Sequence, residues 1–285
     1  MAVSLIGVVG SGIMGGGITE VAAVAGYEVV LRSRELATAE STVACIERSL
    51  AKGVAHGPLA EDERRAALAR INPTDSLHDL SGCDLVIESV VEDLATKRQL
   101  FSELDQICSD KTLLCTNTST LPVIELARIT ERPEMVCGIH FFNPAPTMTV
   151  VEIVRPATAC EETIEQARTF VETCGKKAVV VKDQAGFVVN ALLFPYLNSA
   201  VRLLEQQVAS MEDIDKAMKG GCGFPMGPFA VLDLVGIDTS VAILDALYAE
   251  HRDPGCVAVP RLRGMVAAGQ LGRKSGRGFY EYPHS

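Results

Sequence analysis

Residues 5–15 read Leu-Ile-Gly-Val-Val-Gly-Ser-Gly-Ile-Met-Gly, an apolar, β-branched run that leads into closely spaced glycines. This order predicts a buried strand that turns directly into a helix. Gly10 would permit the tight turn, and Gly12 would keep a phosphate position clear of any side chain. Gly15 would let the helix approach the strand closely.

The residues after this loop complete a unit that is typical of dinucleotide binding. Ile13 and Met14 lie in the loop ahead of the expected helix, whose N-terminal backbone N–H groups would face a pyrophosphate. We expect a helix over 18–25 and a second strand over 28–32, at the distance that a strand-helix-strand unit requires. A glycine turn with no ligand is the competing interpretation, and these flanking elements count against it. The sequence therefore predicts a bound dinucleotide.

Composition limits the classes of protein to consider. With 285 residues and 48% hydrophobic residues, the chain is long enough for two domains with real cores. A net charge of -10 disfavours a nucleic-acid or membrane partner, since both favour a basic surface. The nine cysteines are scattered without metal-ligand spacing, so we expect reduced thiols and no metal site. No signal segment or membrane-spanning run precedes the first strand, which predicts a cytoplasmic protein.

The pattern along the chain predicts an α/β fold: a Rossmann-type doubly wound sheet followed by an all-helical C-terminal domain. Parallel-type strands are expected at 84–90, 113–116, 136–141, 149–154 and 178–181. Residues 36–68 predict two helices broken at 53–58. Helices are expected at 186–204, 211–220, 229–251 and 257–269. The predicted domains are residues 1–184, which bind the dinucleotide, and residues 185–285.

Two residues in successive predicted strands suggest acid-base chemistry. His140 lies at the end of one strand, and Glu152 interrupts the apolar run at 149–154. If these strands are adjacent, Glu152 can hold one imidazole nitrogen and leave the other free to take a proton. Oxidation of an alcohol by hydride transfer needs such a base. Spacing alone favours a structural histidine and an edge carboxylate.

Two further polar residues stand where a substrate could meet them. Ser119 follows a strand at the sheet edge where doubly wound folds bind ligands, although a serine ahead of a proline is also a common helix-capping residue. Asn190 interrupts an otherwise apolar helix, and a buried amide there needs a hydrogen-bond partner. A bond between helices would satisfy Asn190 equally well.

Several stretches, in this order, resemble the L-3-hydroxyacyl-CoA dehydrogenase family. They are VVGSGIMGGGI at 8–18, NTST at 117–120, GIHFFNPAP at 138–146, VEIV at 151–154, KDQAGFVVNALL at 182–193, GFPMGPF at 223–229 and LGRKSGRGFYEY at 271–282. The resemblance spans both predicted domains. It implies hydride transfer between a nicotinamide cofactor and C3 of a short-chain (S)-3-hydroxyacyl-CoA, such as 3-hydroxybutyryl-CoA.

The resemblance also assigns roles to individual residues. It implies His140 as the general acid/base, Glu152 as its partner, and Ser119 and Asn190 as residues that position the substrate oxygen and the imidazole. It further implies that the cofactor binds at the glycine loop and at Glu92, Lys97 and Asn117. A role in substrate binding and in forming a homodimer is implied for residues 185–285.

One departure from the family pattern concerns the cofactor. Members usually carry an acidic residue after the second strand, which binds the adenosine ribose. This chain has Ser33 there, flanked by Arg32 and Arg34. NAD(H) and NADP(H) are both possible, and the missing carboxylate with the added cations favours NADP(H).

A second departure concerns the stretch that resembles the CoA-binding helix end. Ser49, Lys52 and His56 stand where relatives cluster lysines, so the grip on the CoA phosphates should be weak. A thioester carried on an acyl carrier protein is the alternative substrate. A dinucleotide-binding sensor without turnover is a third interpretation. The joint presence of His140, Glu152, Ser119 and Asn190 counts against it.

Overall fold

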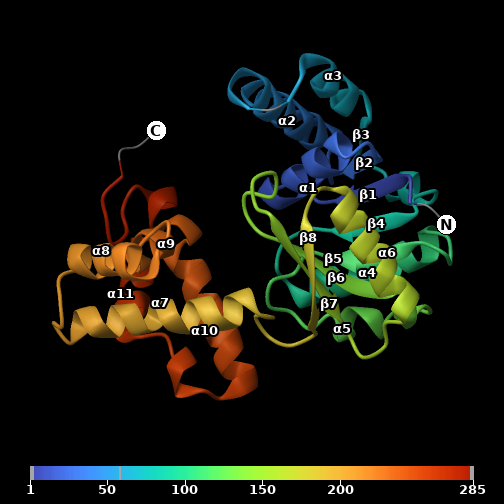
Figure 1. Ribbon diagram of the computed structural model, residues 1–285. Coiled ribbons are helices and arrows are strands. Elements are labelled where there is room, and N and C mark those ends of the chain that lie inside the picture. The colour runs from blue at the N-terminus through green and yellow to red at the C-terminus, as the bar shows by residue number, and fades with distance from the viewer. Residues whose placement is uncertain (1–2, 58, 283–285) are drawn as a thin grey trace. The chain divides into compact units, whose positions relative to one another are not determined.

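The computed structural model describes residues 3–57 and 59–282, and the chain divides into two compact units, residues 1–183 and 184–285. Each unit has its own hydrophobic core. The first is a sheet with helices on both faces, and the described part of the second contains helices and isolated bridges but no strand (Figure 1). The predicted α/β class, with a doubly wound sheet followed by helices, is confirmed.

The first unit is built on an eight-stranded sheet with the order β3-β2-β1-β4-β5-β6-β7-β8. The strands are β1 (Leu5–Val9), β2 (Glu28–Arg32), β3 (Ile71–Thr74), β4 (Leu85–Glu88), β5 (Leu113–Thr116), β6 (Val136–Phe141), β7 (Val150–Arg155) and β8 (Lys177–Lys182). The strand order reverses between β1 and β4, and doubly wound folds bind their ligands beyond the carboxyl ends of the strands at such a point.

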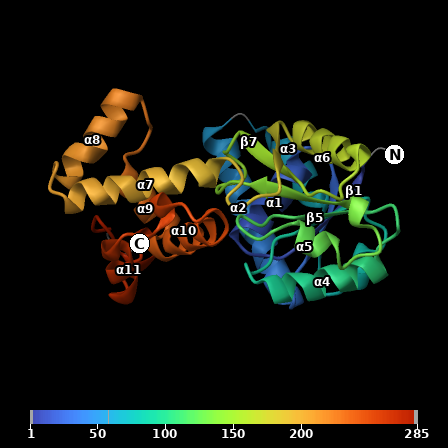
Figure 2. The same ribbon diagram turned by 90° about the horizontal axis from the view of Figure 1, so that it is seen from below.

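Helices cover both faces of this sheet. They are α1 (Ile13–Val24), α2 (Leu36–His56), α3 (Glu61–Ala69), α4 (Leu94–Ile107), α5 (Ile124–Ala127) and α6 (Glu161–Thr173). Apolar residues of α1 and α6 share one core, while α4 lies on the opposite side of the sheet (Figure 2). The start of α5 is fixed by Asp183, whose carboxylate accepts hydrogen bonds from the N–H groups of Val123 and Ile124.

The sheet differs from the sequence-based expectation in two ways. β6 and β7 pair antiparallel, although both were expected to be parallel-type strands; their apolar composition indicates burial and not direction. β3 was not predicted, because Asn72 and Pro73 do not resemble a strand. Proline is tolerated there because β3 is an edge strand.

Helix boundaries also needed correction. α1 begins at Ile13, ahead of the expected 18–25. α2 continues through Gly53 to His56, so the break begins at Gly57, near the end of the expected 53–58; Pro58 lies outside the described residues. The expected helix over 229–251 is two helices, because Gly236 with a φ of 103° interrupts it.

The second unit contains α7 (Val189–Glu205), α8 (Met211–Cys222), α9 (Pro228–Val235), α10 (Ile237–His251) and α11 (Pro260–Ala267). Its core is formed mainly by α7, α9 and α10, with Phe194, Phe229 and Leu244 among the buried residues. Within residues 3–57 and 59–282, no helix combines the length and the apolar composition needed to span a bilayer.

Candidate active site

The glycine loop between β1 and α1 has space for a side chain at one of its three glycines and no space at the other two. A Cβ atom on Gly10, which has a φ of 116°, would lie 2.2 Å from the Ser89 carbonyl oxygen. A Cβ on Gly15 would lie 1.8 Å from the Gly10 carbonyl oxygen, whereas one on Gly12 would meet no atom within 4 Å. The fold therefore requires Gly10 and Gly15, and Gly12 leaves space for a ligand.

The start of α1 suits an anionic ligand. Gly12 is the N-cap residue, no side chain caps the first turn, and that turn contains no acidic residue. Its N–H groups and the helix dipole favour a phosphate. Ile13 is 80% exposed and Val91, just beyond β4, is 66% exposed, while Met14 is half-buried. Exposed apolar side chains at these positions could pack against the aromatic rings of a dinucleotide.

The two predicted cofactor contacts beyond β2, Ser33 and Arg34, differ in their exposure to solvent. Ser33 is buried, and the Ser11 hydroxyl lies 2.8 Å from the Ser33 hydroxyl. Arg34 is exposed. Arg32 donates from Nε to the Asp75 carbonyl oxygen at 3.2 Å, so its guanidinium is already bound at that point. Arg34 is the better candidate for a phosphate contact.

His140 and Glu152 lie opposite each other in the antiparallel β6–β7 pair. His140 Nδ1 is 2.9 Å from Glu152 Oε2, and both side chains are buried. The second ring nitrogen, Nε2, is 3.1 Å from the Ser119 hydroxyl oxygen. With Nδ1 donating to the carboxylate, the lone pair of Nε2 faces Ser119. The structure thus brings together three of the predicted residues.

The fourth, Asn190, belongs to the second unit. It lies in the first turn of α7, and its side chain is buried. Its role at the site stays a prediction.

Glu92 and Lys97 form an ion pair that holds the loop carrying Ser119. Lys97 Nζ is 3.3 Å from Glu92 Oε2. Glu92 Oε1 accepts hydrogen bonds from the Thr118 hydroxyl at 2.5 Å and from the Ser119 N–H at 2.9 Å. Both residues therefore lie beside the catalytic candidates, and in this structure their contacts are with protein atoms.

Asn117 connects three strand ends. Its side-chain oxygen accepts a hydrogen bond from the N–H of Phe141, the residue after His140, at 2.8 Å. Its amide nitrogen donates to the Ser89 hydroxyl at 3.4 Å. Asn117 therefore fixes the end of β6 where His140 lies.

The predicted CoA contacts lie on α2. Ser49, Lys52 and His56 are spaced so that they share one side of the helix, but His56 and Lys52 have no ion pair among the described contacts. Ser49 donates to Glu20 on α1 at 3.0 Å. The pKa of the Glu20 carboxyl lies above its ordinary value. Burial raises this pKa, and that effect is larger than the lowering caused by the Ser49 hydrogen bond and by the charge of Lys176. No signal in the sequence pointed to this carboxylate, because Ser49 lies 29 residues away along the chain.

Sequence reasoning also missed Glu88. It ends β4 with no exposed surface and lies 2.7 Å from Lys97 Nζ. A carboxylate at the end of the apolar run 85–88 is the same signal that singled out Glu152.

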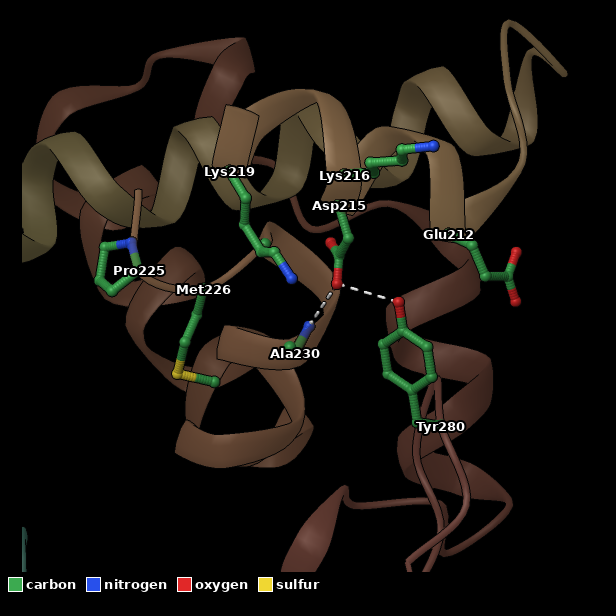
Figure 3. Close-up of a pocket in the computed structure, with 9 residues that line it drawn as sticks. Glu212, Asp215, Lys216, Lys219, Pro225, Met226, Ala230 and Tyr280 are labelled. Carbon is green, nitrogen blue, oxygen red and sulfur yellow. Dashed lines mark hydrogen bonds between the residues drawn. The ribbon is translucent and has the colours of Figure 1, made fainter. Parts of the chain in front are cut away.

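A pocket of about 320 Å³ lies in the second unit, and none of the predicted site residues lines it. Figure 3 shows the Asp215 carboxylate between Ala230 and Tyr280, from which it accepts hydrogen bonds. Burial and the adjacent Asp215 raise the pKa of the Tyr280 hydroxyl, which keeps it protonated as a donor. These contacts tie the C-terminal segment to α8 and α9.

Comparison with known proteins identifies the family. The family model described as "3-hydroxyacyl-CoA dehydrogenase, NAD binding domain" matches residues 5–184. The model of the C-terminal domain of the same family matches residues 186–282. The chain belongs to the 3-hydroxyacyl-CoA dehydrogenase family. The description of the matching N-terminal domain supports a nicotinamide cofactor for this chain.

Three relatives match nearly the whole length of this chain. A 3-hydroxybutyryl-CoA dehydrogenase from Mycobacterium tuberculosis is 45% identical over 283 residues, which is 99% of each chain. The crystal structure of (S)-3-hydroxybutyryl-CoA dehydrogenase from Ralstonia eutropha has a TM-score of 0.96 at 38% identity, covering 99% of this chain and 100% of that one. A mitochondrial hydroxyacyl-coenzyme A dehydrogenase from Sus scrofa is 41% identical, covering 96% and 90%.

Proposed function

We propose that this member of the 3-hydroxyacyl-CoA dehydrogenase family interconverts short-chain (S)-3-hydroxyacyl-CoA and 3-ketoacyl-CoA, such as 3-hydroxybutyryl-CoA and acetoacetyl-CoA. The single observation that carries this proposal is the Ser119–His140–Glu152 chain, with distances of 3.1 and 2.9 Å. The names of the relatives from M. tuberculosis and R. eutropha support the substrate class.

In the oxidation direction, His140 Nε2 takes the proton of the C3 hydroxyl. A bound nicotinamide cofactor would supply the acceptor for the hydride, which carries two electrons away from C3. The C3–O bond becomes a carbonyl, and His140 becomes an imidazolium stabilised by Glu152. Ser119 orients the substrate oxygen toward Nε2. Asn190 is the further positioning residue in this proposal.

For the cofactor, we infer that Gly10, Gly12, Gly15, Ile13 and Met14 receive the pyrophosphate. Glu92, Lys97 and Asn117 would lie near the nicotinamide ribose. The adenosine ribose would meet Ser33 and Arg34, where no carboxylate repels a 2′-phosphate, so NADP(H) is the proposed preference. The family description names NAD, so the preference needs direct measurement.

For the substrate carrier, CoA is favoured over an acyl carrier protein because the relatives are named for CoA thioesters. Ser49, Lys52 and His56 are the proposed contacts of the CoA phosphates. The Glu20 carboxylate behind Ser49 supports a weak grip on this anionic group.

We also propose a cytoplasmic homodimer. The nine free thiols support a reducing compartment. Leu192 on α7 is 72% exposed and Leu234 on α9 is 52% exposed, which supports a subunit interface on the second unit. Light scattering coupled to size-exclusion chromatography tests this: a single peak at twice 30.4 kDa is expected, and a monomer at micromolar concentration would contradict it.

The test of the main proposal is reduction of acetoacetyl-CoA, followed with NADH and NADPH in parallel. We expect turnover with wild type, and a loss of about 10²–10⁴-fold in kcat for His140→Gln. The same acyl group on an acyl carrier protein should react more slowly. Full activity of His140→Gln would refute the assignment, and a kcat/KM at least tenfold higher with NADH than with NADPH would refute the NADP(H) preference.

A further inference from the structure

Glu88 has no part in the proton transfer described above, yet its carboxylate is completely buried at the end of β4. Its oxygens accept hydrogen bonds from Lys97 Nζ at 2.7 and 2.9 Å. The Thr116 hydroxyl donates at 2.7 Å and the Val90 N–H at 2.6 Å. Because a buried carboxylate is costly without partners, these hydrogen bonds make its burial at the end of β4 possible.

Lys97 connects Glu88 to Glu92. Its side chain is 1% exposed, and Nζ lies within 3.3 Å of both Glu88 oxygens and of Glu92 Oε2. An ammonium group has three N–H donors, so these three oxygens use all of them. Lys97 is therefore a bridge between the two carboxylates in this structure.

Glu92, which Lys97 holds in place, binds the loop that carries Ser119. Its Oε1 accepts from the Thr118 hydroxyl, the Ser119 N–H and the Thr120 N–H, at 2.5, 2.9 and 3.2 Å. Burial by itself raises the pKa of the Glu92 carboxyl, but Lys97 and these hydrogen bonds outweigh burial, so the pKa lies below its ordinary value. Glu92 is thus a fixed anion around which the loop is wrapped.

We propose that Glu88 is a positioning residue of the hydride-transfer site, which acts through Lys97 and Glu92 to set Ser119 against His140. The inference rests on the proposed function. If Lys97 is released, Glu92 loses its tether, and the backbone at 118–120 can move. The 3.1 Å approach of the Ser119 hydroxyl to His140 Nε2 then lengthens. A displacement of about 1 Å can cost about 10²-fold in rate.

The first experiment is Glu88→Gln, which keeps the shape of the side chain and removes its charge. We expect kcat for acetoacetyl-CoA to fall about ten- to hundredfold, with KM for acetoacetyl-CoA nearly unchanged. In a Ser119→Ala background the same substitution should cause no further loss, because both changes affect the same contact. Equal losses in the two backgrounds would overturn the proposal.

A second variant separates positioning from folding. Glu88→Gln leaves the buried Lys97 ammonium poorly compensated, which can lower stability by itself. Glu88→Gln/Lys97→Met removes both charges and should recover the melting temperature. We expect its kcat to remain low, because Glu92 still lacks its tether. Recovery of wild-type kcat together with stability would show that the pair only stabilises the fold, and would overturn the proposal.

Asp105→Asn is the matched control. Asp105 on α4 pairs with Arg132 at 2.7 Å, and both side chains are 9% exposed. This variant should lower the melting temperature and leave kcat unchanged. A kcat loss equal to that of Glu88→Gln would indicate general loosening and overturn the proposal. If wild type itself shows no turnover, the proposed function is wrong. If wild type is active and the Glu88→Gln variant is equally active, only the role of Glu88 is wrong.

Discussion

The imidazole of His140 and the carboxylate of Glu152 face each other directly across two antiparallel strands, with Nδ1 2.9 Å from Oε2. Both strands are buried at this point, so neither side chain can satisfy its polar atoms with bulk water. The pairing therefore fixes the ring orientation and leaves Nε2 facing Ser119. A rigid sheet, not a loop, holds the proposed proton acceptor.

Replacing Glu152 with Gln should slow the reaction without preventing folding. The amide preserves the shape and can still bond to Nδ1, but it no longer stabilises the imidazolium that forms when Nε2 takes the proton. We expect kcat to fall about 10- to 10³-fold, with little change in KM. Steady-state kinetics with acetoacetyl-CoA measures this, and an unchanged kcat would contradict a role for Glu152 in proton transfer.

Two glycine variants should fail in different ways. Gly12→Ala adds a methyl group where no atom lies within 4 Å, so the protein should fold normally and bind the dinucleotide much more weakly. Gly15→Ala forces the methyl group to within 1.8 Å of the Gly10 carbonyl oxygen, so stability should fall as well. Thermal unfolding and NADH titration distinguish them; a Gly12→Ala variant with unchanged affinity would argue against a phosphate at this loop.

Ser33→Asp should move the cofactor preference toward NAD(H). The new carboxylate would repel a 2′-phosphate and could bind the ribose hydroxyls. Two unit charges 4 Å apart interact by about 1 kcal/mol in bulk water and by about 4 kcal/mol near a protein surface. The ratio of kcat/KM with NADPH to kcat/KM with NADH should therefore fall about five- to tenfold or more. Arg34→Gln should act in the same direction. No change in the ratio for either variant would place the ribose elsewhere.

Glu20 predicts a pH dependence of CoA binding. Burial raises the pKa of its carboxyl, so the group is neutral below that pKa and negatively charged above it. A charge behind Ser49 would repel the CoA phosphates, and KM for acetoacetyl-CoA should rise as the pH increases through the Glu20 pKa. In Glu20→Gln this rise should disappear, and KM at alkaline pH should be about two- to fivefold lower than in wild type. Glu172→Gln, an exposed change on α6, is the control and should behave like wild type.

The cysteines should divide into reactive and inert groups. Cys45 and Cys222 are exposed, whereas burial raises the pKa of Cys83 and of Cys174 to about 12. Because the thiolate is the reactive form, a thiol-specific reagent should modify Cys45 and Cys222 first. A Cys45→Ser/Cys222→Ser variant should lose the fast phase. A fast phase that persists would show that the buried thiols become accessible.

The sequence by itself determined the α/β class, the glycine turn into α1 and the helical character of the second unit, because hydrophobic period and glycine placement are local properties. It could not decide the antiparallel pairing of β6 with β7, nor the edge strand containing Pro73, because burial in a strand does not specify its partner. It singled out His140, Glu152 and Ser119, but their meeting depends on strand register. Only the tertiary structure decided that Glu88, Lys97 and Glu92 form one chain of charges reaching Ser119, since these residues come from a strand, a loop and a helix that only the packed fold holds within hydrogen-bond distance.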